Sequence, residues 1–231
     1  MNINKPSHGQ TIFWRIFLII LFTLGLKATP IYGKDDILPS FGNGAIKVVL
    51  YTDYFCPPCR DMEPGLEPIL LELVKDGAIH LTFVDLPTSQ YTELYAKYFL
   101  YSLGEKRDID SAIQARRTLF EAAEKRVVDK NQLVNLLAEK KIGLKPIDLA
   151  PAFNLWNRLL QEHQIRSTPS CVIVHGDLKE THKGSIEVPK ALENLKEVFF
   201  QRRPALPDNK KEERNGVEKG STKPSLVKKG E

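Results

Sequence analysis

The alternation of apolar and polar positions predicts a strand, a helix and a second strand early in the chain. Residues 45–52 (AIKVVLYT) are rich in β-branched and apolar side chains, which is typical of a buried strand. Residues 57–74 repeat apolar side chains at helical spacing, and Asp76 and Gly77 end this pattern. Residues 78–87 (AIHLTFVDLP) predict another strand. The order strand, helix, strand predicts a βαβ unit with two parallel strands.

The middle of the chain has helical periodicity throughout. Four segments between about residues 91 and 163 repeat apolar side chains every three to four positions, which predicts an all-helical subdomain. Asp129 and Gln132 resemble a capping box at the start of the third helix. Residues 171–184 then predict a β-hairpin, and residues 188–203 predict a final helix. The fold class is therefore α/β, with helices inserted between its two strand-bearing halves.

The N-terminal segment, residues 1–33, contains a basic leader and an unbroken apolar run over residues 16–26. A bilayer span needs about 20 apolar residues, so the shorter run fits the centre of a signal peptide. Neither candidate cleavage site, after Ala28 or Gly33, has a small residue at the third position back, so an uncleaved N-terminal membrane anchor remains an alternative. Both interpretations predict a periplasmic or other extracytoplasmic location, where disulfides persist.

Residues 34–202 are predicted to form the folded domain, which begins with a loop over residues 34–44. Residues 203–231 contain no aromatic side chain and few large apolar ones, which predicts a disordered basic tail. The whole chain has a net charge of only +4, with 42% hydrophobic and 27% charged residues. This composition is that of an ordinary globular protein, and we expect no nucleic-acid partner.

Cys56 and Cys59 enclose Pro57 and Pro58 at the predicted junction of strand and helix. The first cysteine would lie at the helix N-terminus, where unpaired N–H groups and the helix dipole stabilise a thiolate. The second lies one turn later, within reach of a mixed disulfide on the first. Proline is tolerated here because N–H groups of the first turn have no helical partner. The motif predicts a redox pair, with Cys56 as nucleophile, Cys59 as resolving thiol and the prolines as the active-site loop.

Three other uses of such a pair compete with the redox interpretation. A zinc site needs further ligands, and the sequence has neither a second CxxC motif nor a suitably spaced histidine pair. A disulfide that closes so short a loop would add little stability. Two thiolates alone are soft ligands that suit Cu(I). We therefore expect no metal and no cofactor, and keep a Cu(I)-binding thioredoxin-like chaperone as an alternative function.

Residues outside the motif add one more signal and several structural assignments. Thr168-Pro169 directly precedes the predicted hairpin, which suggests a tight cis turn. Cys171 lies in an apolar run and is interpreted as a buried, unreactive thiol. Asp53 could orient the loop, but it is interpreted as a surface acid, and His163 as a residue without an evident partner. The helix-spaced aromatic and aliphatic side chains Phe153, Trp156 and Leu160 are assigned to the core.

Together these features resemble the DsbA-like thiol–disulfide oxidoreductases, which have a thioredoxin-like fold with an inserted helical subdomain. VVLYTDYFCPPCR, TFVDLP, LFEAAEK and RSTPSCVIV are similar to landmarks of that family, in the same order, and the resemblance covers about residues 45–202. It implies that Cys56 and Cys59 are the exchanging pair. It also implies that Pro169 is a cis-proline, that Thr168 faces the dithiol, and that the backbone there binds substrate by strand addition. The implied partners are unfolded or cysteine-containing substrate proteins and a membrane redox partner.

Two departures from the family bear on the direction of electron flow. The family often has a buried acid six positions before the first cysteine, where this chain has Leu50. Its strongest oxidants often have a histidine between the cysteines, whereas Pro58 has no N–H to offer the Cys56 thiolate. The amides of Cys59 and Arg60 then become the expected donors. We predict an oxidase whose pair is less oxidising than a histidine-bearing one, with a reductase, for example in cytochrome maturation, as the alternative.

Overall fold

The computed structural model describes residues 39–202. The predicted signal peptide or anchor (1–33) and the predicted tail (203–231) lie outside these described residues. Within residues 39–202, the search for a helix long and apolar enough to cross a bilayer finds none.

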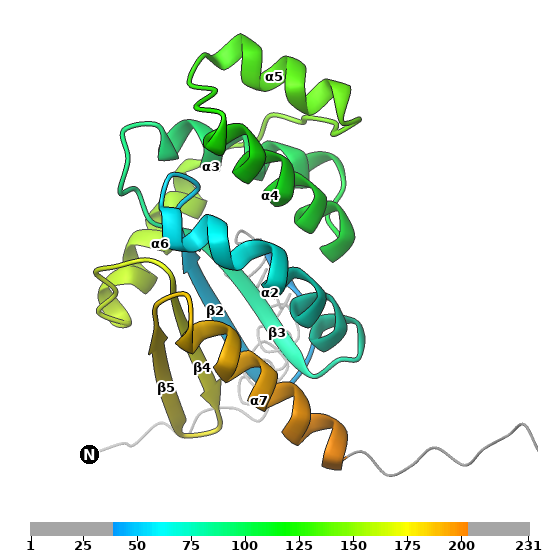
Figure 1. Cartoon of the computed structure of the whole chain (residues 1–231), viewed down its shortest axis with the longest axis vertical. Helices are drawn as coiled ribbons and strands as arrows, with labels where there is room; N and C mark the ends of the chain where they lie inside the picture. Colours follow the sequence, from blue (N-terminus) through cyan, green and yellow to red (C-terminus); the bar gives the residue numbers. More distant parts are fainter. Residues whose placement is uncertain (1–38, 203–231) are drawn as a thin grey trace, which may run out of the picture.

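A five-stranded mixed sheet forms the centre of the molecule, with the strand order β1-β3-β2-β4-β5 (Figure 1). The central strand β2 (Ile46–Thr52) pairs in parallel with β3 (Ile79–Asp85) and antiparallel with β4 (Ser170–His175). Strand β5 (Leu178–Lys183) completes the hairpin with β4, and β1 (Ser40–Phe41) pairs with the outer side of β3. The predicted parallel βαβ unit and the predicted hairpin are both confirmed.

The prediction of a loop over residues 34–44 is wrong at Ser40 and Phe41, which form strand β1. Its two residues pair antiparallel with β3, Ser40 opposite Thr82 and Phe41 opposite Leu81. The Ser40 and Thr82 hydroxyls lie 2.8 Å apart, and Phe41 is buried. So short a segment has no periodicity of its own, and only the partner strand, about forty positions away, makes it a strand.

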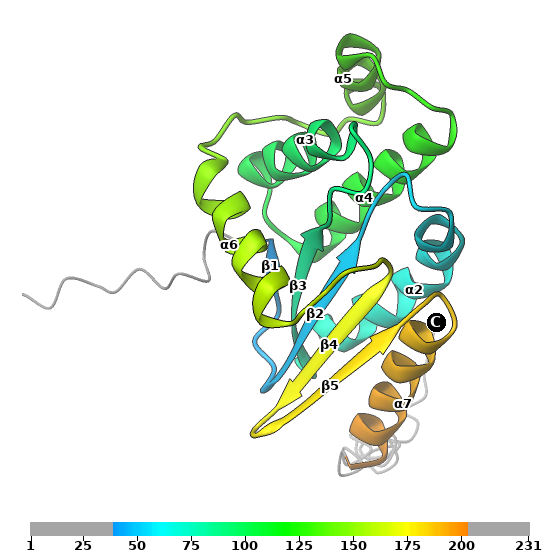
Figure 2. The same cartoon turned by 90° about the vertical axis from the view of Figure 1, so that its left-hand side faces the viewer.

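Helices cover both faces of the sheet, and part of the helical insertion extends beyond it. Helices α2 and α7 pack side by side, and α3 to α6 all lie between β3 and β4 in the chain (Figures 1 and 2). The inserted helical subdomain and the final helix are therefore confirmed. Their bounds are α2 Pro57–Lys75, α3 Thr92–Glu105, α4 Ile109–Glu124, α5 Lys130–Glu139, α6 Ala150–Glu162 and α7 Glu187–Arg202.

Side chains of β2 alternate between two hydrophobic clusters on opposite faces of the sheet. Val48 and Leu50 belong to the larger cluster, which includes the buried sides of α2 and α4. Val49 and Tyr51 belong to the smaller one, with Trp156 from α6. This period of two is the geometry of an extended strand buried on both faces. Figure 2 shows α6 and α2 on opposite sides of the sheet, so the end of β2 emerges between two helical layers.

Candidate active site

The dithiol lies where the chain leaves β2 and enters α2. Cys56 is the N-cap residue of α2, with extended backbone, and its side chain is half-buried. Cys59 is one turn into the helix and fully buried, and both cysteines are free thiols. Pro57 and Pro58 fill the first helical turn and are exposed. One thiol is thus accessible at the positive end of a helix dipole, and the other is held behind it.

One detail of the predicted site is wrong, namely the group to which the first amides of α2 donate. The N–H groups of Cys59 and Arg60 donate to the carbonyl oxygen of Cys56, at 3.0 and 3.2 Å, and not to its sulfur as the sequence suggested. This is the ordinary start of a helix, in which the N-cap carbonyl accepts the first intrahelical bonds.

The loop before β4 is distant from the dithiol in sequence but lies beside it in the structure. The Thr168–Pro169 peptide bond is cis, which confirms the predicted turn. The Cys56 Sγ donates to the carbonyl oxygen of Thr168 at 3.4 Å. The carbonyl oxygen of Pro169 accepts from the N–H of Gly184 at 2.9 Å, which ties this loop to the end of the hairpin. All four residues predicted for exchange and substrate binding therefore lie at one place.

The two thiols differ in environment. Burial raises the pKa of the Cys59 thiol far above its usual range, and the neighbouring Cys56 raises it further. Hydrogen bonds with the Asp53 backbone and the Thr168 side chain act in the opposite direction but do not outweigh burial. Cys59 is therefore a protonated thiol at neutral pH while the dithiol is reduced.

The comparisons with known proteins bear on the fold that carries this site. A family model described as thioredoxin matches residues 42–194. The chain belongs to the thioredoxin family. The comparison with curated proteins finds no significant match.

Several solved structures are similar to this fold. A periplasmic thioredoxin-like protein from Salmonella enterica serovar Typhimurium is 19% identical, with a TM-score of 0.54, over 73% of this chain and 91% of that one. Oxidised BdbD from Bacillus subtilis is 20% identical, with a TM-score of 0.52, over 69% and 93%. A variant of alpha-DsbA1 from Wolbachia pipientis is 12% identical, with a TM-score of 0.53, over 73% and 97%. The resemblance to DsbA-like proteins is confirmed at the level of the fold.

The third cysteine of this thioredoxin-family chain lies in β4, away from solvent. Cys171 is fully buried and pairs across the sheet with Leu50. Burial raises the pKa of its thiol to about 12. A thiol that is both inaccessible and protonated is a poor nucleophile. The interpretation of Cys171 as a buried thiol is confirmed.

We predict that Cys171→Ala leaves disulfide exchange unchanged. The variant should keep the wild-type reduction potential and exchange rate within about twofold, at a cost of about 1 kcal/mol in stability for the small cavity. Equilibration with glutathione, followed by alkylation of free thiols, measures the potential. A potential that moves by more than about 30 mV, equivalent to about 1.4 kcal/mol, would give Cys171 a part in the redox reaction.

The prediction that Asp53 is a surface acid is wrong. Its side chain is fully buried just before the dithiol and accepts hydrogen bonds from the N–H of Phe55 at 2.7 Å and of Thr88 at 2.9 Å. The hydroxyl groups of Thr88 and Thr92 also donate to it. One signal was available in the sequence, since an Asp that follows a strand often bonds the N–H two residues later.

His163 has a partner that the sequence did not reveal. Its Nδ1 lies 2.6 Å from the hydroxyl of Tyr51, a residue of β2 that faces α6. Burial, with Lys179 nearby, lowers the pKa of the imidazole. The neutral ring thus joins the end of α6 to the face of the sheet opposite α2.

A buried group of charges lies on the face of the sheet toward α2 and α4. The Arg116 guanidinium of α4 is fully buried and makes two hydrogen bonds to Glu63 of α2, at 2.7 and 3.1 Å. It also donates to Thr52 at 3.1 Å and lies 3.7 Å from Asp85. Burial raises the pKa of Asp85 to about 7, although Arg116 opposes this shift. Leu50 is apolar, so the position at which the resemblance led us to look for a buried acid has none. The buried carboxyl groups on this face are those of Glu63 and Asp85.

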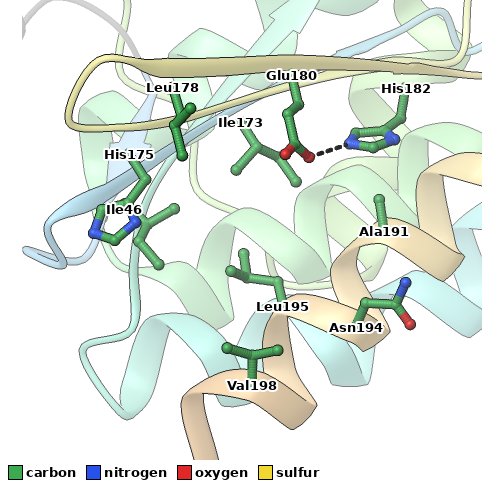
Figure 3. Close-up of a pocket in the computed structure, with 10 residues that line it drawn as sticks. All are labelled: Ile46, Ile173, His175, Leu178, Glu180, His182, Ala191, Asn194, Leu195 and Val198. Carbon is green, nitrogen blue, oxygen red and sulfur yellow. Dashed lines mark hydrogen bonds and ion pairs between the residues drawn. The ribbon is translucent and has the colours of Figure 1, made fainter. Parts of the chain in front are cut away.

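A surface concavity between the β4–β5 hairpin and α7 is separate from the dithiol (Figure 3). Its volume is about 250 Å³, and its lining contains none of the predicted site residues. Its histidines, His175 and His182, come from opposite strands of the hairpin, and His182 pairs with Glu180 at 3.3 Å. Over residues 39–202, no group of three or more potential ligands among His, Cys, Asp and Glu is placed to hold a metal ion.

Proposed function

We propose that the protein is an exported thiol–disulfide oxidoreductase that exchanges disulfides with substrate proteins through Cys56 and Cys59. The observation that carries the proposal is the position of the half-buried Cys56 sulfur, at the N-terminus of α2 and 3.4 Å from the carbonyl oxygen before the cis-proline Pro169. An accessible thiol at a helix N-terminus, with a second thiol one turn behind it, suits formation and resolution of a mixed disulfide.

In the oxidising direction, a substrate thiolate attacks Cys56 of the Cys56–Cys59 disulfide. The Cys56–Cys59 bond breaks, and its electron pair goes to Cys59, which takes up a proton. A second substrate thiolate then attacks the substrate sulfur of the mixed disulfide and releases Cys56. Two electrons and two protons pass from the substrate to the dithiol, and an oxidised redox partner removes them by the same exchange.

The backbone before β4 is the proposed substrate-binding segment. Arg166 and Ser167 are exposed and Thr168 is half-buried, so this stretch is accessible beside the Cys56 sulfur. An extended substrate segment can add to it as a strand, through main-chain hydrogen bonds that do not depend on sequence. Such binding suits unfolded, cysteine-containing proteins of many sequences.

Export and a membrane partner are the remaining parts of the proposal. Export is supported by the apolar run of residues 16–26 behind a basic leader, and by the fold shared with the periplasmic thioredoxin-like protein from Salmonella. In such a compartment an oxidase needs an acceptor for its electrons, and a membrane protein is the proposed one.

The reduction potential tests the proposed direction. Equilibration of purified protein with glutathione should place the pair between about −270 mV, the value of thioredoxin, and about −120 mV, that of the strong oxidant DsbA. A value at or below the thioredoxin figure would favour a reductase. Retention of Cu(I) against a chelator, without exchange on a reduced unfolded protein, would replace the oxidoreductase by the copper chaperone.

We predict that Pro58→His makes the pair more oxidising. The substitution restores an N–H at the second helical position and adds an imidazole near the Cys56 thiolate, and Pro58 is exposed enough to accept it. A recovered charge-assisted hydrogen bond of about 1.5–3 kcal/mol corresponds to about 30–60 mV. Pro58→Ala is the control, because it restores only the N–H. An unchanged potential in both variants would show that Pro58 does not set the potential, and a lower potential in both would contradict the predicted direction.

A further inference from the structure

The carboxylate of Asp53 joins two segments that are distant in sequence. On one side it accepts from the N–H of Phe55, in the loop that carries Cys56. On the other it accepts from Thr88 and Thr92, where the chain leaves β3 and enters α3. Asp53 is itself fully buried, so these contacts replace its entire hydration. A buried carboxylate with donors on every side is a rigid link between the segments that supply them.

The main chain of Asp53 continues this link to both cysteines. Its carbonyl oxygen accepts from the N–H of Cys56 at 3.2 Å. A hydrogen bond with its backbone also lowers the pKa of the Cys59 thiol, against the larger effect of burial. The segment from Thr52 to Cys56 is fixed at its start as well, because the N–H of Leu86 donates to the Thr52 carbonyl oxygen at 2.8 Å.

We propose that Asp53 is a positioning residue, which holds the Cys56 loop against the start of the helical insertion so that Cys59 is aligned to resolve mixed disulfides. The inference rests on the proposed function. Asp53 does not touch the reacting sulfur atoms with its side chain, and it acts through the loop that it anchors. Resolution is an intramolecular step, and its rate depends steeply on the alignment of the reacting groups.

Asp53 could act through its negative charge or through the hydrogen bonds that hold the loop in place, and these two explanations lead to different predictions. A charge acting through space would have the same kind of effect from Asp61, an exposed acid five residues after Cys56. Asp61→Asn removes one negative charge from α2, as Asp53→Asn does from the loop, but it breaks none of the hydrogen bonds described above. Thr92→Val removes one donor to Asp53 without changing charge, and Thr92→Ser keeps the hydroxyl. These four variants separate the two explanations.

The test follows the mixed disulfide itself, in a Cys171→Ala background. Reduced protein reacts with glutathione disulfide: Cys56 attacks one sulfur and releases one glutathione, and Cys59 then displaces the second to form Cys56–Cys59. Acid quenching and mass spectrometry count the glutathionylated protein over time, across a range of pH. Far-ultraviolet circular dichroism and urea unfolding show that each variant is folded before it is compared.

We expect resolution to slow by about tenfold in Asp53→Asn and about threefold in Thr92→Val, by a similar factor at every pH of the profile. Thr92→Ser and Asp61→Asn should stay within about twofold of the parent across the same profile. Equal rates at every pH in all four folded variants would overturn the inference. If Asp53→Asn does not fold, the two Thr92 variants decide. A parent protein that forms no mixed disulfide at all would instead refute the proposed function.

Discussion

A Cys59→Ser variant is expected to accumulate covalent complexes with its substrates. In the proposed cycle a mixed disulfide on Cys56 is released when Cys59 attacks it, and Cys59 lies one turn behind Cys56, fully buried. A serine at this position has nearly the same size but a hydroxyl that does not attack a disulfide under these conditions. The intramolecular route is then closed, and only slow attack by external thiols remains.

The size of this effect follows from the loss of an intramolecular reaction. Effective concentrations of aligned groups reach about 10⁵ M or more, so loss of Cys59 should extend the lifetime of the mixed disulfide at least about a thousandfold at millimolar external thiol. Cys59→Ser protein, expressed as the full chain, should migrate in non-reducing gels as a ladder of complexes that collapses on reduction. Mass spectrometry of the excised bands identifies the substrates.

Two controls assign the roles of the cysteines. Cys56→Ser should form no complexes and catalyse no exchange, because Cys59 is inaccessible to a substrate. Cys171→Ala should behave as wild type, since that thiol is fully buried in β4. If Cys59→Ser turns over normally, or if Cys56→Ser traps substrates instead, the assignment of nucleophile and resolving thiol is wrong.

The parts of the site that could be predicted are those with local signals. Cys56 and Cys59 are close in sequence and straddle a strand-to-helix junction, so one stretch of sequence carries most of their geometry. Thr168-Pro169 is far from them in sequence, but a Thr-Pro pair before a strand is itself a turn signal, and the cis bond is present. The helices of the insertion are predictable for a similar reason, because each has its own period.

The parts that could not be predicted depend on contacts between distant segments. Asp53 and Arg116 are charged residues, and a sequence without its fold gives no reason to bury them. Arg116 meets Glu63 from 53 positions away, and Asp53 meets Thr92 from 39. Strand β1 also exists only through a distant partner. A charge is buried only where the fold brings donors and acceptors together, and a linear pattern does not contain that information.

The buried arginine gives the largest expected effect on stability. Arg116 belongs to the inserted helix α4, and its partner Glu63 belongs to α2, directly beyond the dithiol. The centre of the Phe83 aromatic ring lies 4.2 Å from the guanidinium carbon, so the arginine also packs against the sheet. One side chain thus connects the insertion, the helix that carries the dithiol and the sheet, and because it is fully buried its charge is weakly screened.

We predict that Arg116→Ala lowers the free energy of unfolding by about 3–5 kcal/mol, because it leaves Glu63 buried without its cation. Arg117→Ala is the matched control on the next residue of α4. The side chain of Arg117 is 56% exposed, but that of its partner Glu67 is only 10% exposed, so the loss of Arg117 should cost about 1–2 kcal/mol, less than the loss of Arg116. Urea unfolding of the reduced proteins measures both values.

The double variant Arg116→Met with Glu63→Gln distinguishes an unpaired charge from lost packing. If the uncompensated carboxylate is the main penalty, the double variant should be more stable than Arg116→Met alone by at least about 1 kcal/mol, since these two variants differ only in the charge at residue 63. If the double variant is as unstable as Arg116→Met, the packing of the guanidinium against the aromatic rings is what holds α4 in place. If Arg116→Ala costs no more than Arg117→Ala, Arg116 does not connect the insertion to the active-site helix in the way its contacts indicate.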